Sequence, residues 1–194
     1  TGGLRRTSED KIGRRFQSYF GYPTIPEGTG GRASFSSTSP LLSVAYKITP
    51  SVSTYLRYAE GFKGGGFNGE ADSIKDSTIP FRPETLKALE LGLKSSLLDG
   101  RAIVNMALFR NRSSDQQQAV FNAGTTAGST VANIAESTTS GFEVEAALRV
   151  TPDLRLQLGY GYLHGKYDKF PDSNGKNVAD NIAVVRMPKH SLNL

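Results

Sequence analysis

A glycine-rich stretch offers the spacing of a nucleotide-binding loop. Gly64, Gly66 and Gly69 follow the pattern G-x-G-x-x-G, and the run VSTYLRYAE before them is a plausible strand. A dinucleotide fingerprint also requires a helix directly after the glycines. The following run, ADSIKDSTIPFRP, is rich in Ser, Thr, Asp and Pro and has no 3.6-residue apolar period, so no helix is predicted. We therefore interpret the match as accidental, and the glycines require another explanation.

Two carboxylates and two histidines are the other candidates for chemistry. Glu143 and Glu145 point the same way on one predicted strand, as a glycosidase pair could, but no partner group or aromatic platform accompanies them. His164 and His190 lie far apart on different predicted strands, without Cys or an H-x-x-x-H spacing, so no metal site is predicted. No G-x-S-x-G motif occurs with a placed His and Asp. The sequence therefore predicts neither an enzyme nor a cofactor.

Composition excludes several further classes. The 194 residues contain no cysteine, which excludes a disulfide framework and a thiolate metal site. There is no apolar run of about 18 residues, which excludes a transmembrane helix. The formal net charge is +5, but the basic residues are scattered apart from Arg5–Arg6 and Lys11–Arg15, so no nucleic-acid partner is predicted. Because the chain starts at Thr1 and stops in a strand-like run, we expect an internal fragment.

Period-2 alternation is the strongest pattern along the chain. Apolar residues alternate with polar or small ones in the segments 41–48, 88–97, 142–149, 154–162 and 191–194. Leu89 and Leu91, for example, share one face, and Glu90 and Gly92 share the other. Successive strand side chains point to opposite faces, so the pattern predicts two-faced strands. The segment 101–110 is less clear because both of its faces are largely apolar.

The connections between these strands alternate in length. Short turn signals fall at Thr49–Ser51, Asp99–Gly100 and Thr151–Asp153, and long polar segments span roughly 61–83, 112–137 and 165–187. Tight hairpins fit the short signals. Within the second long segment we expect 115–121 to extend a strand and 122–133 to be an exposed loop. One end of the sheet should therefore carry tight turns and the other long loops.

Both faces of these strands fit a membrane barrel better than a soluble sandwich, whose inner faces fill one core. The second face carries Glu90, Lys94, Glu143, Glu145, Arg149, Arg155 and Gln157, with small residues between them. In a barrel the apolar face meets lipid and the charged face lines a wet lumen. Tyrosines and phenylalanines near the strand ends suit an interfacial girdle, although aromatic residues are common in strands generally. The predicted fold is all-β, an antiparallel transmembrane β-barrel segment of about seven strands.

Four runs carry a more specific signal: TYLRYAEGFKGGGFN, FRPETLKALELGLKSSLLDGRAIVNMALFRN, GFEVEAALRVTPDLRLQLGYGYLHGKY and MPKHSLNL. In order and spacing they resemble the barrel of TonB-dependent outer-membrane receptors. The matching landmarks are Pro83–Glu84, the E-L-G-L-K of 90–94, Asn105 with Phe109, Gly141-Phe142-Glu143, and Pro188. The resemblance covers about residues 41–194. We expect a partial barrel domain there and an extracellular loop region over residues 1–40.

The resemblance implies a barrel of about 22 strands closed by an N-terminal plug domain. It implies short periplasmic turns, long extracellular loops and a place in the bacterial outer membrane, in contact with its lipid. Such receptors import a scarce nutrient, most often a ferric siderophore, with energy from TonB. The plug, the TonB box and the C-terminal strands are not in this sequence. A passive porin-like barrel and a soluble β-rich binding module are the alternatives.

The same resemblance assigns a place to the glycine-rich stretch, at the rim where a strand enters an extracellular loop. Glycines there permit positive φ and close backbone approach. We predict Phe62, Lys63, Phe67 and Asn68 as ligand-contacting residues at this extracellular rim. The phenylalanines could instead lie at the lipid interface, and Lys63 could be a solvated surface lysine. Because ferric ligands of this family arrive already chelated, their binding requires no bond between the protein and the metal.

Overall fold

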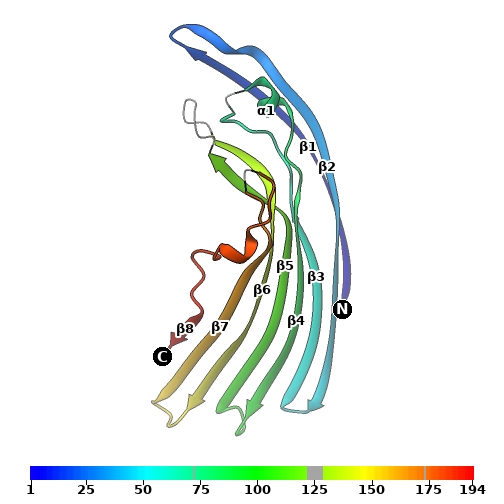
Figure 1. Cartoon of the computed structure of the whole chain (residues 1–194). Coiled ribbons are helices and arrows are strands. Elements are labelled where there is room, and N and C mark those ends of the chain that lie inside the picture. Colours follow the sequence, from blue (N-terminus) through cyan, green and yellow to red (C-terminus); the bar gives the residue numbers. More distant parts are fainter. Residues whose placement is uncertain (72, 122–128, 173) are drawn as a thin grey trace.

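The computed structural model describes residues 1–71, 73–121, 129–172 and 174–194, and it contains one antiparallel sheet of eight strands. The elements are β1 (Gly2–Tyr19), β2 (Tyr22–Thr49), β3 (Val52–Lys63), α1 (Ile74–Thr78), β4 (Glu84–Leu97), β5 (Ala102–Phe121), β6 (Ser129–Arg149), β7 (Arg155–Lys169), η1 (Ala179–Asn181) and β8 (His190–Asn193). Strands adjacent in sequence are adjacent in the sheet (Figure 1). The sheet is curved and open, with β1 and β8 at its edges. The predicted all-β antiparallel class is confirmed.

The short turns after β2, β4 and β6 lie at one end of the strands and the long connections after β3 and β7 at the other, as the turn signals predict (Figure 1). The β4–β5 turn is tight because Leu98, Asp99 and Gly100 have φ values of 54°, 53° and 83°. Long connections over 64–83 and 170–189 lie at the other end. The segment 122–128, part of the predicted exposed loop, lies outside the described residues. No helix among the described residues is long and apolar enough to span a bilayer.

The strand register places all apolar faces on one side of the sheet. Leu56, Leu91, Leu108, Phe142 and Tyr162 form one row of direct cross-strand partners. The neighbouring row on the opposite side is Tyr55, Gly92, Ala107, Glu143 and Gly161. We call the side with the leucines the outer face and the other side the inner face. The register thus resolves the segment 101–110, where Met106 and Leu108 belong to the outer face.

The outer face is apolar yet uncovered. Leu91, Leu108 and Leu156 each expose about half of their surface, at 49%, 57% and 54%. Fully buried apolar side chains among the described residues are few and mostly alanines. A contiguous exposed apolar face of this size requires an apolar environment. This sheet therefore matches the wall of a membrane barrel, not half of a soluble sandwich.

Residues 1–40 form regular structure where we expected a loop region. β1 pairs with β2 from Gly2–Leu42 to Tyr19–Tyr22, and Phe20 and Gly21 close the hairpin with φ values of 50° and 81°. This ribbon rises beyond the other strands (Figure 1). The sheet consequently has eight strands instead of about seven. Most residues of the ribbon are polar or small on both faces, so the ribbon gave no alternation signal. The extracellular position of the ribbon remains a prediction.

Strands also continue into the other polar segments. β5 reaches Phe121, which confirms the predicted extension over 115–121, and β6 begins at Ser129, inside the predicted loop. The prediction of no helix after the glycines is wrong in one detail. The five-residue α1 begins at Ile74, where the Ser73 side chain accepts a hydrogen bond of 3.0 Å from the Asp76 backbone N–H. Because α1 does not directly follow the glycines, it supplies no phosphate-binding helix end.

On the inner face, one tyrosine ring lies across a glycine of the next strand. Tyr55 is the direct partner of Gly92, and a Cβ atom at Gly92 would collide with the Tyr55 ring. The Tyr55 hydroxyl donates a 2.6 Å hydrogen bond to Glu90, and Lys94 Nζ lies 5.7 Å from the ring centroid. Glu90 and Lys94 thus find their partner on the neighbouring strand, as the strand spacing predicts.

We expect Gly92→Ala to lower the free energy of unfolding by about 1–3 kcal/mol, because the new methyl group overpacks against a ring that its hydroxyl holds in place. Gly159→Ala is the matched control, since a Cβ there lies 3.6 Å from Asn193 Cβ, an ordinary contact. Its change should stay within about 0.5 kcal/mol. Urea titration of the full-length receptor folded in bilayers measures both. Equal losses in the two variants would contradict the packing account.

The face assignment predicts unequal tolerance of charge. Leu91→Arg puts a cation on the outer face, and we expect a loss of about 2–4 kcal/mol of stability near the bilayer midplane. Glu143→Arg puts the same side chain on the inner face and should fold normally. The fraction of receptor that refolds into lipid vesicles, read from its heat-modifiable migration, measures the difference. Similar tolerance of both variants would show that the faces are assigned wrongly.

Candidate functional site

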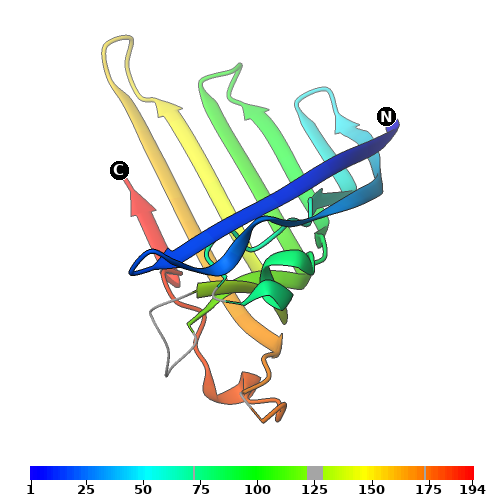
Figure 2. The ribbon, with the colours of Figure 1, turned by 90° about the horizontal axis from the view of Figure 1, so that it is seen from above.

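The connection 64–83, here called the rim loop, lies against the inner face of the β1–β2 ribbon. Lys11 Nζ donates a 2.7 Å hydrogen bond to the Gly65 carbonyl oxygen. A Cβ atom at Gly65 would lie 2.5 Å from Cε1 of Phe35. Real Cβ atoms do not approach so closely, so the glycine is needed for the loop to reach the ribbon. Figure 2 shows α1 and the ribbon passing across the strand ends. This close approach explains the glycine at position 65.

Two of the four predicted ligand residues are engaged within the chain. The Phe67 ring covers the directly paired glycines Gly13 and Gly31, whose hypothetical Cβ atoms would lie 2.5 Å and 2.7 Å from it. The Asn68 amide oxygen accepts a 2.6 Å hydrogen bond from the Val131 N–H, and its NH₂ donates to the Val131 carbonyl at 3.3 Å. Phe67 therefore holds the rim loop to the ribbon, and Asn68 holds it to β6.

The other two predicted residues lie at the end of β3 and point to opposite faces. Phe62 belongs to the outer face, in register with Thr85, and is half-buried. Lys63 belongs to the inner face, in register with Glu84, and its side chain is exposed. The four predicted residues thus do not converge on one site. Only Lys63 presents a charged group toward the inner side of the rim.

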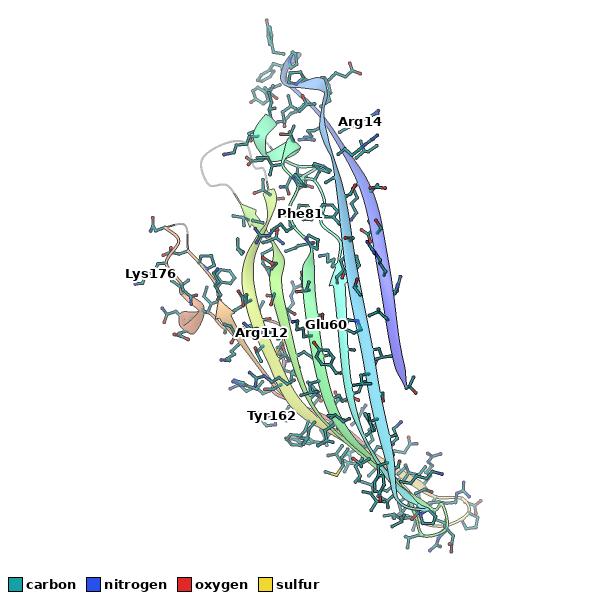
Figure 3. The ribbon with its side chains drawn as sticks, turned by 90° about the vertical axis from the view of Figure 1, so that its right-hand side faces the viewer. Arg14, Glu60, Phe81, Arg112, Tyr162 and Lys176 are labelled. Carbon is teal, nitrogen blue, oxygen red and sulfur yellow. The ribbon has the colours of Figure 1, made fainter. Side chains whose placement is uncertain are left out.

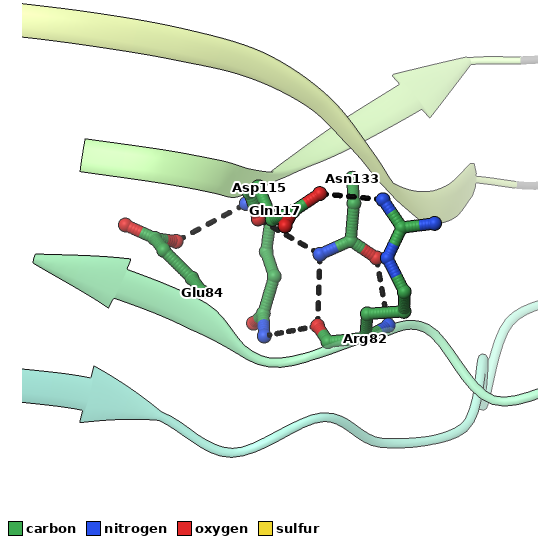
Figure 4. Close-up of polar contacts among 5 residues, drawn as sticks. All are labelled: Arg82, Glu84, Asp115, Gln117 and Asn133. Carbon is green, nitrogen blue, oxygen red and sulfur yellow. Dashed lines mark hydrogen bonds and ion pairs between the residues drawn. The ribbon is translucent and has the colours of Figure 1, made fainter. Parts of the chain in front are cut away.

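Five other residues form a polar cluster at the base of the rim loop, here called the rim junction (Figure 4). They are Arg82, Glu84, Asp115, Gln117 and Asn133. Asn133 accepts from the Arg82 N–H at 2.7 Å and donates to the carbonyl oxygens of Arg82 and Asp115 at 2.8 Å each. Arg82 also forms an ion pair with the Asp115 carboxylate. β6 and β5 are thereby tied to the chain just before β4.

Gln117 extends the junction toward the glycines. Its side-chain NH₂ donates to the carbonyl oxygens of Gly64 at 3.0 Å and Arg82 at 3.1 Å, and its backbone N–H donates to Glu84 at 3.1 Å. Asp115 has a φ of 53° at a register shift of the β5–β6 pair. Sequence reasoning missed this junction. Its one local signal is that aspartate is among the few residues that tolerate positive φ.

The inner face below the rim is a polar wall. Glu143 and Glu145 border a shallow hollow with Gly159, Gly161, Ser191 and Asn193. Arg155 and Gln157 line the adjoining hollow next to Glu145. Both carboxylates thus lie on the inner face, as predicted, and no third acidic residue joins them in these hollows. The arrangement suits solvation or a polar partner, with no positioned acid–base pair.

The histidines are closer than the sequence analysis predicts, because β7 and β8 are neighbours. His190 pairs with Tyr162, two residues from His164, and His190 Nδ1 lies 2.8 Å from Tyr160 Oη. No group of three or more His, Cys, Asp or Glu side chains that could hold a metal occurs in the part of the chain that the structure describes. The described polar side chains of the inner face and the rim provide hydrogen-bonding and charged groups.

Comparison with known proteins agrees with the geometry. The family model "TonB dependent receptor-like, beta-barrel" matches residues 1–194. The metal-pseudopaline receptor CntO of Pseudomonas aeruginosa is 26% identical over 163 residues, which are 84% of this chain and 21% of that protein. The ferric-pyoverdine 358 receptor of Pseudomonas putida is 26% identical over 150 residues, 75% of this chain and 17% of that protein. The chain thus spans about a fifth of the length of these relatives.

Solved structures agree at the level of the fold. The ferric yersiniabactin uptake receptor FyuA of Yersinia pestis superimposes with a TM-score of 0.72 at 20% identity, over 98% of this chain and 27% of that one. The matched segment there is part of a receptor barrel, which accounts for an open sheet with one apolar and one polar face. The chain belongs to the TonB-dependent receptor family, as part of its β-barrel in the bacterial outer membrane.

Proposed function

We propose that this chain forms part of the wall and outer rim of a receptor that actively imports a ferric siderophore or a similar metal chelate, energised through TonB. The observation that carries the proposal is that the rim loop is held against the inner face of the β1–β2 ribbon, above the polar inner face of the sheet. Related proteins named as metal-chelate receptors support the ligand class. No acid–base pair or metal-binding cluster among the described residues favours an enzyme.

The residues of this chain would divide the work by position. The apolar outer face anchors the wall in lipid, and the inner face, with Glu90, Glu143 and Glu145, keeps the lumen hydrated. The rim junction fixes the rim loop, so that recognition takes place on a rigid frame. TonB would act on a plug domain, which the family resemblance implies and which lies outside this sequence.

Within this proposal, Lys63 contacts the ligand. Phe62 faces outward, and Phe67 and Asn68 are engaged by the ribbon and by β6. Lys63 is exposed on the inner face, and its register partner Glu84 accepts a hydrogen bond from Gln117. An exposed ammonium group at the mouth of the lumen suits an anionic chelate.

The transport proposal is tested by uptake into cells that carry the full-length receptor as their only outer-membrane iron receptor. The probes are ⁵⁵Fe-loaded siderophores of the hydroxamate, catecholate and mixed classes. We expect saturable uptake of at least one class, lost when the tonB gene is deleted. Binding to the cell surface should survive that deletion, because energy is needed for import and not for recognition.

A passive porin-like barrel would give a different result. Uptake would then be non-saturable and unchanged by loss of TonB, and small neutral solutes would enter as readily as the chelates. Failure of every probe to bind or enter would reject the metal-chelate class, even though the barrel fold would stand.

The role of Lys63 predicts a specific change in affinity. Lys63→Ala should weaken binding of the transported anionic chelate about 3–10-fold, the size of an exposed charge contact. Lys47→Ala removes an equally exposed inner-face lysine next to the short β2–β3 turn and should leave affinity unchanged. Equilibrium binding to intact cells measures both variants. Unchanged affinity in Lys63→Ala would remove this residue from the site.

A further inference from the structure

The outer face changes from uncharged to charged partway along each strand. Counting from the short turns, the outer-face residues of β3, β4 and β5 are uncharged up to Tyr58, Leu89 and Leu108. Charged residues then begin, and we call this group the collar: Glu60, Lys87, Arg110, Arg112, Glu136, Lys166 and Asp168. In Figure 3, Glu60 and Arg112 lie farther from the short turns than Tyr162.

The collar cations reach outward, whereas its carboxylates lie against the sheet. The ion pairs are Lys87–Glu60 at 3.8 Å, Arg112–Glu136 at 3.1 Å and Lys166–Asp168 at 3.1 Å. Their cationic side chains are 60%, 59% and 60% exposed, and their carboxylate side chains 29%, 32% and 24%. Although the charges nearly balance, the outermost groups are positive.

Hydroxyl groups hold two of the carboxylates inward. Tyr58 donates to Glu60, and Thr138 donates to Asp168 at 2.5 Å. The Asp168 carboxylate, held by Thr138, in turn orients Lys166 through their ion pair. The carboxylates position the cations, whose side chains remain largely exposed.

The cations are also placed close to one another. Lys87 and Arg112 are direct cross-strand partners, an arrangement of like charges that is unfavourable by itself. Arg112 uses one nitrogen for Glu136, out of the five N–H donors of a guanidinium group. Arg110 is exposed on the same strand and has no ion-pair partner among the residues that the structure describes. An anion seated between these groups would relieve the repulsion.

We propose that the collar binds the phosphate groups of lipids in the outer leaflet, whose acyl chains lie against the uncharged outer face below. One observation favours a lipid as the source of the anion. The collar continues directly from the apolar rows that contain Leu89 and Leu108, so chain and headgroup contacts are adjacent. Charge-assisted hydrogen bonds from Arg and Lys are also the usual means of holding phosphate. The proposal depends on the membrane location and is independent of the transported ligand.

The test uses the purified full-length receptor and fluorescent lipid A, a diphosphorylated glycolipid, titrated in dodecyl maltoside micelles. We expect Lys87→Gln/Arg112→Gln/Lys166→Gln to weaken lipid A binding at least about 10-fold. The matched control Lys47→Gln/Arg149→Gln/Arg155→Gln removes as many cations from the inner face and should bind within about twofold of wild type. Equal binding by the collar variant and wild type would overturn the proposal.

A second test uses only the wild-type protein, so it decides the proposal even if the collar variant fails to fold. Enzymatically dephosphorylated lipid A keeps the acyl chains and sugars, and we expect it to bind at least about 10-fold more weakly than lipid A. Equally tight binding of the two lipids would show that only the apolar face matters. Displacement of lipid A by millimolar inorganic phosphate would indicate a site for free phosphate and would also overturn the proposal.

Discussion

The fold depends on one constraint: in hydrocarbon, every backbone N–H and C=O must find its partner within the protein. Seven consecutive antiparallel pairings satisfy this for the strands from β2 to β7 on both sides. The register that makes these bonds also aligns the side chains, so Leu56, Leu91 and Leu108 fall in one row. β1 and β8 are the edge strands of this sheet, and in a closed barrel wall neighbouring strands would satisfy their free backbone groups.

Beyond the lipid the constraint weakens, because water can satisfy polar groups. The strands continue there without an apolar face, and tertiary contacts take over from the membrane. Glycines at 13, 31 and 65 let the rim loop approach the β1–β2 ribbon closely, and the Asn133 amide ties β6 to two other segments, at Arg82 and Asp115. Rigid placement of the rim follows from these contacts, and recognition of a ligand requires such a frame.

The sequence predicts the features that contact with lipid imposes on the strands, and few others. Alternation located the strands from 41 onward, their faces and the short turns, since each outer-face leucine must recur with period 2. The β1–β2 ribbon gave no such signal because most of its residues are polar or small on both faces. The rim junction joins residues 51 positions apart, such as Arg82 and Asn133, and no local pattern records such contacts. Of the predicted ligand residues, Phe67 and Asn68 proved to be engaged within the chain.

The most direct test of the central claim compares two consecutive residues of β5. The chain has no cysteine, so Asn105→Cys and Met106→Cys can be introduced singly into a cysteine-free full-length receptor and labelled with bimane. Asn105 lies on the inner face and Met106 on the outer face. In vesicles that contain nitroxide-labelled lipid, bimane at position 106 should be strongly quenched and bimane at 105 should not. Equal quenching, or stronger quenching at 105, would contradict the two-faced wall on which the account rests.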